Sequence, residues 1–410
     1  MNRQRLMVGL ALPIGMVVLA GCGSGSDTGA TTATSSPDPV TTTTRIAPSS
    51  TSTSTISSST APTTTTIAAS PLDLPACQEP SSCSHPMADQ AVWELPVLSI
   101  RYLPDADADG FVDFDATGFQ GTVEELRRRV ELLDIAGAWW MTEATRYRQG
   151  QGEVRPSLGY RVVDVIESQA TVPPGRPVPW NEGWFRPDYQ AILSDLDLCR
   201  WVDGLGVREV WMWTQHHGLI EPAESNMWSP VGDISNSERT DDLPACEHSY
   251  TVYNYNFTRG VAEMLHNHGH QAEALFGRGD AHLFWDEFVG ARTSEGGLEA
   301  PFRCGWTHTP PNGLSHYDTF SDRTVASDCG AWEPAGGEVS DMDCSVWFEA
   351  VYEDPACFDD GGLAFSVWWF QGVPGEGNGL SYQGKALTNW WQLFADLESA
   401  VDSPSWLLEG

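Results

Sequence analysis

The chain has 410 residues, with 56 acidic and 22 basic side chains, so its formal net charge at pH 7 is −34. This excess of acids argues against nucleic acid as a partner, because phosphate binding depends on Lys and Arg side chains. The segment from residue 72 onward is long enough to bury a large core, and we expect a single globular domain over residues 72–410.

The first residues have the pattern of an export signal. Two arginines precede an apolar run from Leu6 to Ala20, which is shorter than the about 20 residues that span a bilayer. The run ends in Leu-Ala-Gly-Cys22, which resembles the lipobox of bacterial lipoproteins. The resemblance implies that residues 1–21 are a cleaved signal peptide and that Cys22 is diacylated. Because two acyl chains anchor a protein stably, we expect Cys22 to attach the protein to the cell membrane on its extracytoplasmic face.

Residues 22–71 consist almost entirely of Ser, Thr, Ala, Gly and Pro. Such a segment has too little apolar surface to offset the entropy lost on ordering. We therefore expect a disordered stalk between the lipid anchor and the globular domain.

Hydrophobic periodicity in the globular domain predicts strands that alternate with helices. The expected strands are residues 95–102, 160–166 and 207–213, and the expected helices are residues 122–146, 188–205, 257–276, 283–289 and 386–401. Residues 173–187 and 290–365 read as mostly irregular. Alternation of this kind predicts an α/β fold with a mainly parallel sheet flanked by helices, and leaves barrel and open sheet as alternatives.

Eight cysteines remain when Cys22 is set aside. An even number in an exported chain predicts up to four disulfides, so we expect long disulfide-linked loops. These cysteines are Cys77, Cys83, Cys199, Cys246, Cys304, Cys329, Cys344 and Cys357.

An acidic loop follows the first expected strand. Acids occupy its first, third, fifth and ninth positions, and Gly110 is sixth; the acids are Asp105, Asp107, Asp109 and Asp113. This spacing resembles the calcium loop of the EF-hand and dockerin families. The resemblance implies calcium as a cofactor, although the twelfth position is Ala116 instead of an acid. A plain acidic turn is the alternative.

The strongest candidate site lies in the expected helix 257–276. Steps of about 100° per residue place two imidazoles and two carboxylates on one stripe of that helix; they are Glu263, His266, His270 and Glu273. Such a set can bind a divalent transition metal, above all zinc. Zinc proteases with this histidine spacing have Glu after the first His, whereas this chain has Asn267, which argues against protease chemistry. Alternatively, Gly269 ends the helix and the imidazoles only pack.

A second candidate follows the strand 207–213. In parallel α/β folds ligands bind at the carboxyl ends of strands. The loop from this strand to the expected helix 257–276 is long, and long loops in compact domains are usually functional. We expect His216 to be a further metal ligand and His217, Glu221 and Glu224 to be catalytic, with one glutamate as general base. The segment 303–318, which contains His308, suits a pocket wall or a cross-linked surface loop.

These patterns together predict a surface-anchored secreted hydrolase that depends on a divalent transition metal. Two alternatives stay open. One is a carbohydrate-active enzyme that uses paired carboxylates and platforms drawn from the 18 tryptophans. The other is a non-catalytic surface binding protein. The expected substrate is extracellular, either a glycan or a peptide.

Overall fold

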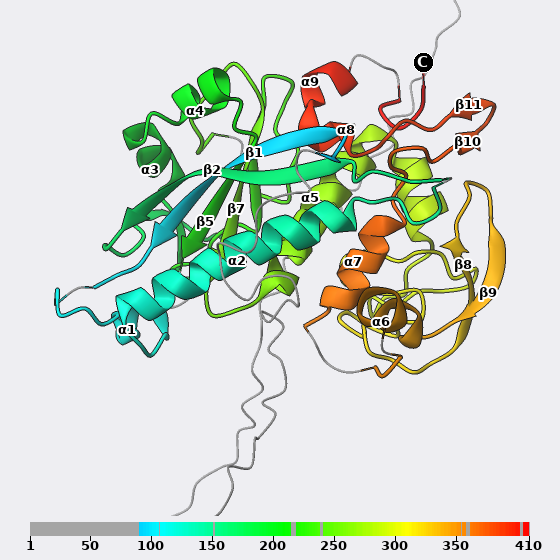
Figure 1. Ribbon diagram of the computed structural model, residues 1–410, viewed down its shortest axis with the longest axis horizontal. Coiled ribbons are helices and arrows are strands. Elements are labelled where there is room, and N and C mark those ends of the chain that lie inside the picture. The colour runs from blue at the N-terminus through cyan, green and yellow to red at the C-terminus, as the bar shows by residue number, and fades with distance from the viewer. Residues whose placement is uncertain are drawn as a thin grey trace, which may run out of the picture. The chain divides into compact units, whose positions relative to one another are not determined.

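The computed structural model describes residues 90–409, apart from residues 106, 151, 215–218, 238–240, 354, 358–360 and 402–404. A five-stranded sheet with the order β2-β1-β5-β7-β6 runs through these residues (Figure 1). Four strands are parallel, and β6 pairs antiparallel with β7 at one edge. The bounds are β1 Trp93–Tyr102, β2 Leu158–Ser168, β5 Glu209–Thr214, β6 Ser225–Trp228 and β7 Tyr250–Asn256. The predicted α/β fold with a mainly parallel sheet is confirmed, and the sheet is open.

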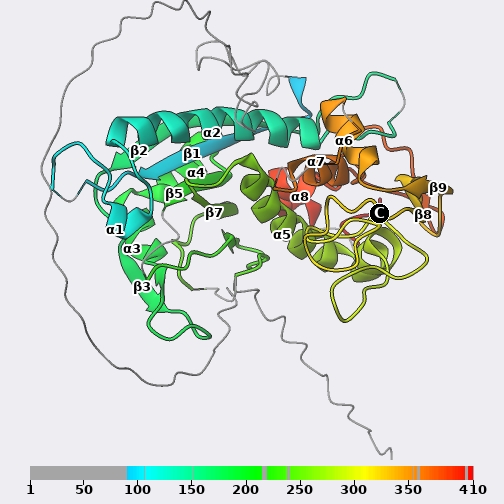
Figure 2. The same cartoon turned by 90° about the horizontal axis from the view of Figure 1, so that it is seen from below.

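Helices cover both faces of the sheet, and Figure 2 shows α2 on one side and α3 on the other. The first face packs against α2 (Val123–Ala144), α5 (Val261–Gly279) and α7 (Leu363–Gln371), and the second against α3 (Tyr189–Asp195) and α4 (Leu198–Leu205). Successive strand side chains point to opposite faces. In β5, accordingly, the tryptophans join the first core and Val210 and Met212 the second. Burial on both faces explains the continuous apolar run in this strand.

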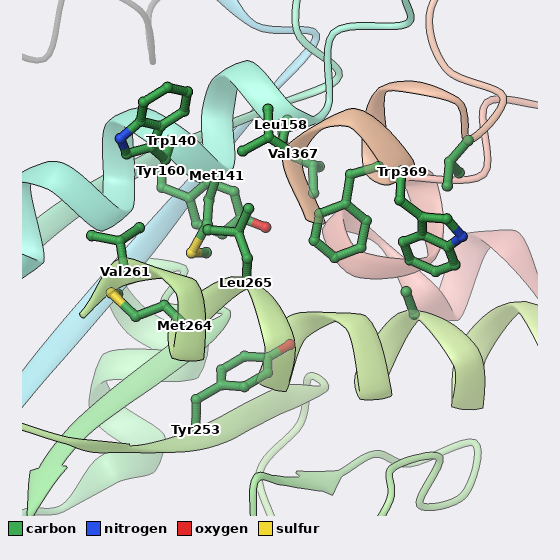
Figure 3. Packing of buried hydrophobic residues seen from close by; sticks show 14 of the residues in the cluster. Trp140, Met141, Leu158, Tyr160, Tyr253, Val261, Met264, Leu265, Val367 and Trp369 are labelled. Carbon is green, nitrogen blue, oxygen red and sulfur yellow. The ribbon is translucent and has the colours of Figure 1, made fainter. Parts of the chain in front are cut away.

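The first core is rich in aromatic side chains. Figure 3 shows Met141 of α2 and Leu265 of α5 beside Tyr160 of β2, with Val367 of α7 near Leu158 and Tyr253 between β7 and α5. Most tryptophans with a described environment serve packing, as the apolar runs around them predict. Those less than 2 % exposed are Trp211, Trp213, Trp332, Trp347, Trp369, Trp390 and Trp391.

Several element boundaries follow local sequence signals, but one expected helix is divided in two. A capping box of Thr122 and Glu125 begins α2, where the sequence predicts a helix start. The expected single helix 188–205 is instead α3 and α4, because Asp197 takes a left-handed conformation with φ 50° between them. Aspartate tolerates that conformation better than most residues.

The C-terminal half contains more regular structure than predicted. Residues 290–365 include β8 (Val325–Ala331), β9 (Glu338–Met342), α6 (Ser345–Tyr352) and the start of α7. A π-helix, η3 (His282–Val289), follows α5, and the short α1 (Phe114–Thr117) precedes α2. The proline-rich segment 173–187 forms a hairpin of β3 (Pro174–Pro177) and β4 (Phe185–Pro187). The expected helix 386–401 shrinks to α8 (Gln392–Ala395) and α9 (Leu397–Ala400), after the hairpin of β10 (Ser381–Tyr382) and β11 (Lys385–Ala386).

Three disulfides link described cysteines: Cys199–Cys246, Cys304–Cys329 and Cys344–Cys357. The first joins α4 to the segment before β7, and the other two cross-link the loop-rich part after η3. Cys77, Cys83, the lipobox and the stalk lie outside the described residues. Among the residues the structure describes, no helix combines the length and apolar character needed to cross a bilayer.

Candidate metal centre

Helix α5 carries the predicted stripe without interruption. It runs from Val261 to Gly279, so the alternative that it ends at Gly269 is wrong. Gly269 instead permits a close approach, because a Cβ atom there would lie 2.4 Å from Oγ1 of Thr307. The absent side chain at this position brings the loop that contains Thr307 and His308 against the helix.

Three imidazoles meet beside this contact. The Nε2 atom of His270 lies 3.2 Å from Nε2 of His266 and 3.0 Å from Nε2 of His308. A ligand atom from each of the three histidines lies within 4.8 Å of the other two. The His270 ring stands edge-on to both other rings, which are nearly parallel to each other. The three Nε2 atoms therefore face one small volume.

A carboxylate closes one side of this group. Glu224 directly precedes β6, which pairs with β7 next to the start of α5. Its two oxygen atoms lie 3.5 Å from Nε2 of His266 and 3.5 Å from Nε2 of His270. The amide of Asn236 donates to Glu224 Oε2 at 2.6 Å and holds the side chain in place. Since the Glu224 side chain is 42 % exposed and those of His266 and His270 are 19 % and 11 % exposed, the carboxylate lies on the solvent side.

A second carboxylate orients His270 from behind. Glu273 Oε2 lies 3.0 Å from Nδ1 of His270 and accepts a hydrogen bond from its N–H group. The backbone N–H of Thr307 donates to the other oxygen of Glu273 at 2.9 Å. In a neutral imidazole, donation from Nδ1 leaves the lone pair on Nε2. Whenever His270 is neutral, as a metal ligand must be, Glu273 therefore directs its Nε2 lone pair toward the other two histidines.

The electrostatics of the group favour a cation. Burial by itself lowers the pKa of His270, but Glu224 and Glu273 raise it to about 9. Burial would raise the pKa of Glu224, yet the neighbouring imidazoles hold it well below its usual range. Burial and the two other histidines lower the pKa of His308 to about 3, and burial also lowers the pKa of His266. The two carboxylates thus stabilise one positive charge, and two imidazoles keep free lone pairs.

Tyr317 completes the exposed side of the group. Its hydroxyl lies 3.1 Å from Nε2 of His308, and its ring contacts the rings of His308 and His266. The Tyr317 N–H donates to the carbonyl oxygen of His308 at 2.6 Å. Its φ of 62° is left-handed, which is unusual for a bulky residue and often marks a functional position.

The structure places the other predicted residues as follows. Glu263 accepts a hydrogen bond from the backbone of Asn256 at 3.0 Å, and burial raises its pKa to about 7. Glu221 accepts from the indole of Trp180 at 3.0 Å and from the amide of Asn181 at 3.1 Å. His216 and His217 lie outside the described residues.

The acidic loop directs its carboxylates to its own backbone. Asp105 accepts from the N–H groups of Asp109 and Gly110, both at 3.1 Å. Asp113 caps α1 by accepting from the N–H of Ala116 at 3.1 Å. Asp107 is exposed at the tip. The expectation of calcium stays a prediction.

Sequence reasoning missed two members of the group. His308 and Tyr317 both lie in the segment 303–318, which the sequence indicates only as a candidate pocket wall; His308 is 38 residues beyond His270. The usable signal is Gly269, whose place inside a helix points to a close neighbour. A comparison of the sequence with models of known protein families finds no match, and neither does a comparison with curated proteins.

Proposed function

We propose that the protein is a lipid-anchored, extracytoplasmic hydrolase that uses a divalent transition-metal ion, zinc above all, held by His266, His270 and His308. The observation that carries the proposal is the convergence of the three Nε2 atoms beside the Glu224 carboxylate. Three histidines with a fourth position left for water are a recurrent ligand set of catalytic zinc.

The distances between the imidazole nitrogens are compatible with a shared ion. Zinc–nitrogen bonds of about 2.0–2.1 Å in tetrahedral geometry put ligand nitrogens about 3.3 Å apart, close to the 3.2 Å and 3.0 Å measured here. The hydrogen bond from His270 to Glu273 matches the carboxylate–histidine–metal arrangement of such sites. Glu273 would therefore support the ion through His270 without binding it directly.

The exposed side of the centre supports catalysis over a purely structural role. A structural zinc site is closed by four protein ligands, whereas a catalytic site leaves one position for water or substrate. Glu224 is the most exposed acid of the group and contacts two of the three imidazoles. A bound ion lowers the pKa of a water molecule to about 7. Glu224 would accept the proton of that water as general base and later return it to the leaving group.

The anchoring part of the proposal rests on the lipobox ending at Cys22 and gains support from the disulfides. Such bonds persist in oxidising compartments outside the cytoplasm, and three are present among the described residues. Labelling of cells with a radioactive fatty acid tests it. We expect label on the wild-type chain and none on Cys22→Ser, and equal labelling of both would contradict the proposal.

Metal analysis of the purified, disulfide-bonded protein tests the centre. We expect about one zinc, manganese or iron ion per chain in the wild type and none in His266→Ala/His270→Ala. His282→Ala is the matched control, because His282 is an exposed histidine that pairs with Asp286 on η3. Absence of metal from the wild type, together with normal folding of the double variant, would contradict the proposal.

Glu224→Gln separates metal binding from chemistry. A general base can be removed while the three imidazoles stay in place, so we expect metal content to persist and ester hydrolysis to fall about 100-fold or more. A panel of p-nitrophenyl esters supplies the assay, with chelator-treated and zinc-restored wild type as references. Full activity in Glu224→Gln would exclude this carboxylate as the base.

A further inference from the structure

We propose that Tyr317 is a further catalytic residue of this centre and that the substrate is a neutral acyl compound, an ester or amide. The phenol would donate a hydrogen bond to the acyl oxygen as that oxygen gains negative charge. The inference rests on the proposed function, because it requires an ion between the three histidines.

The position of the hydroxyl carries the first step of the argument. It lies 3.1 Å from Nε2 of His308. An ion about 2.0–2.1 Å from the same nitrogen would lie at most about 5 Å from the phenol oxygen. A hydrogen bond between two oxygen atoms is about 2.7 Å long, so the phenol can reach an oxygen atom bound beside the ion. Tyr317 is 52 % exposed and the Glu224 side chain is 42 % exposed, so both reach solvent beside His266, which each of them contacts.

The backbone holds the phenol in this position. Tyr317 has a φ of 62°, and its N–H donates to the carbonyl oxygen of His308 at 2.6 Å. Its ring lies 4.7 Å from that of His308 and 5.9 Å from that of His266, measured between centroids. A donor fixed before the reaction stabilises developing charge without reorganisation. We therefore interpret the left-handed backbone of Tyr317 as the conformation that positions its hydroxyl group as a donor.

The negative charge around the site favours a neutral acyl substrate over a phosphate ester. Two carboxylates, Glu224 and Glu273, contact the histidines, and the whole chain has a formal charge of −34. Phosphoryl transfer sites use Arg, Lys or several metal ions to neutralise their substrate. A neutral carbonyl avoids repulsion on entry, and its tetrahedral intermediate gains one negative charge, which an ion and one phenol can stabilise.

The step balances without another reactant. The oxygen of water forms a bond to the acyl carbon, and Glu224 takes the water proton. The acyl oxygen gains the electron pair of its double bond and accepts the hydrogen bond from Tyr317, which keeps its proton. When the double bond reforms, the bond to the alcohol or amine breaks, and the proton on Glu224 passes to the leaving group. The products are a carboxylic acid and an alcohol or amine.

Acetate binding to the cobalt-loaded protein tests the phenol without knowledge of the natural substrate. Cobalt(II) replaces zinc with a visible spectrum, and acetate presents a charged acyl oxygen at the open position. We expect Tyr317→Phe to bind cobalt as the wild type does and to weaken acetate binding about 10-fold to 100-fold, the range for a hydrogen bond to a charged group. The control is Tyr382→Phe, because Tyr382 lies on β10 and contacts His282.

The outcomes separate this inference from the proposed function. Cobalt binding with equal acetate affinity in the wild type and Tyr317→Phe overturns the role of the phenol and leaves the metal centre intact. Weaker cobalt binding by Tyr317→Phe, with a changed spectrum before acetate is added, would make Tyr317 a metal ligand and would also overturn its role as a hydrogen-bond donor. Failure of the wild type to bind cobalt or zinc overturns the metal centre and this inference together.

Discussion

Replacement of Gly269 by alanine tests how the two halves of the site are brought together. The new Cβ atom would lie 2.4 Å from Oγ1, 2.7 Å from Cγ2 and 3.1 Å from Cβ of Thr307. Rotation of the Thr307 side chain cannot relieve the last contact, so the loop must move. Alanine favours a helix over glycine by about 1 kcal/mol, and overpacking costs about 1–3 kcal/mol. The net effect on the free energy of unfolding should lie between no change and a loss of about 2 kcal/mol.

Gly204→Ala supplies the reference for this variant. Gly204 lies inside α4, and no atom lies within 4 Å of the place that an added methyl group would take. This variant should therefore show only the increase in the free energy of unfolding that comes from the higher helix propensity of alanine. The two variants should therefore differ by about 1–3 kcal/mol, or roughly 2–6 °C in the melting temperature of a large domain. Differential scanning calorimetry measures the difference under identical conditions.

Zinc affinity gives the functional side of the same test. Movement of the loop should displace His308. We therefore expect Gly269→Ala to bind zinc about 10-fold or more weakly, which is the effect of losing a residue that orients a metal ligand. Competition with a chromophoric chelator measures this. Thr307→Ala in the same chain should restore part of the affinity, since Oγ1 of Thr307 has no hydrogen-bond partner among the described residues. Unchanged affinity together with a melting temperature raised as in Gly204→Ala would refute the reasoning.

Three further predictions concern single carboxylates. Glu273→Gln should weaken zinc binding about 10-fold to 100-fold by loosening His270, as chelator competition would show, and an unchanged affinity would contradict its orienting role. Asp134→Ala should destabilise the fold by about 3–5 kcal/mol, because it leaves the buried Arg101 without its 2.7 Å partner; urea unfolding measures this, and a loss below about 1 kcal/mol would contradict it. Burial raises the pKa of Asp233 from 3.8 to about 7, so the folded state holds its proton more tightly and stability falls as pH rises through this interval. Asp233→Asn should lack that fall, so its melting temperature should rise relative to wild type between pH 4 and pH 8, and parallel pH profiles would refute the assignment.

The sequence predicts well what depends on local periodicity. The apolar run of β5 identifies a strand that is buried on both faces. The spacing along α2 and α5 identifies helices, because burial along a helix repeats about every 3.6 residues. The same spacing puts His266 and His270 on one stripe, and the structure agrees. Strand β7 escapes prediction because its alternate tyrosine and asparagine side chains look exposed, although Asn254 is buried and bonded to Tyr189 and Ala223.

Other features depend on contacts that no local pattern encodes. The apolar run of α7 fits a buried strand or a buried helix equally well, so periodicity cannot assign it. His308 reaches the centre only because Gly269 lets its loop lie against α5, and Glu224 only because β6 pairs back onto β7. Both contacts are set by tertiary packing, which explains why the sequence places His308 only in a pocket wall.

Glu273 links the rigid and the irregular parts of the centre. One of its oxygen atoms accepts from His270 on the helix, and the other accepts from the N–H of Thr307, the residue before His308. The orientation of one imidazole and the position of the next are therefore set by the same carboxylate. A change at Glu273 should disturb both ligands at once. A change at Asn236 should instead disturb Glu224, to which it donates, and the neighbouring Ser225, from which it accepts. Glu273 therefore supports metal binding although its carboxylate points away from the shared volume of the three Nε2 atoms.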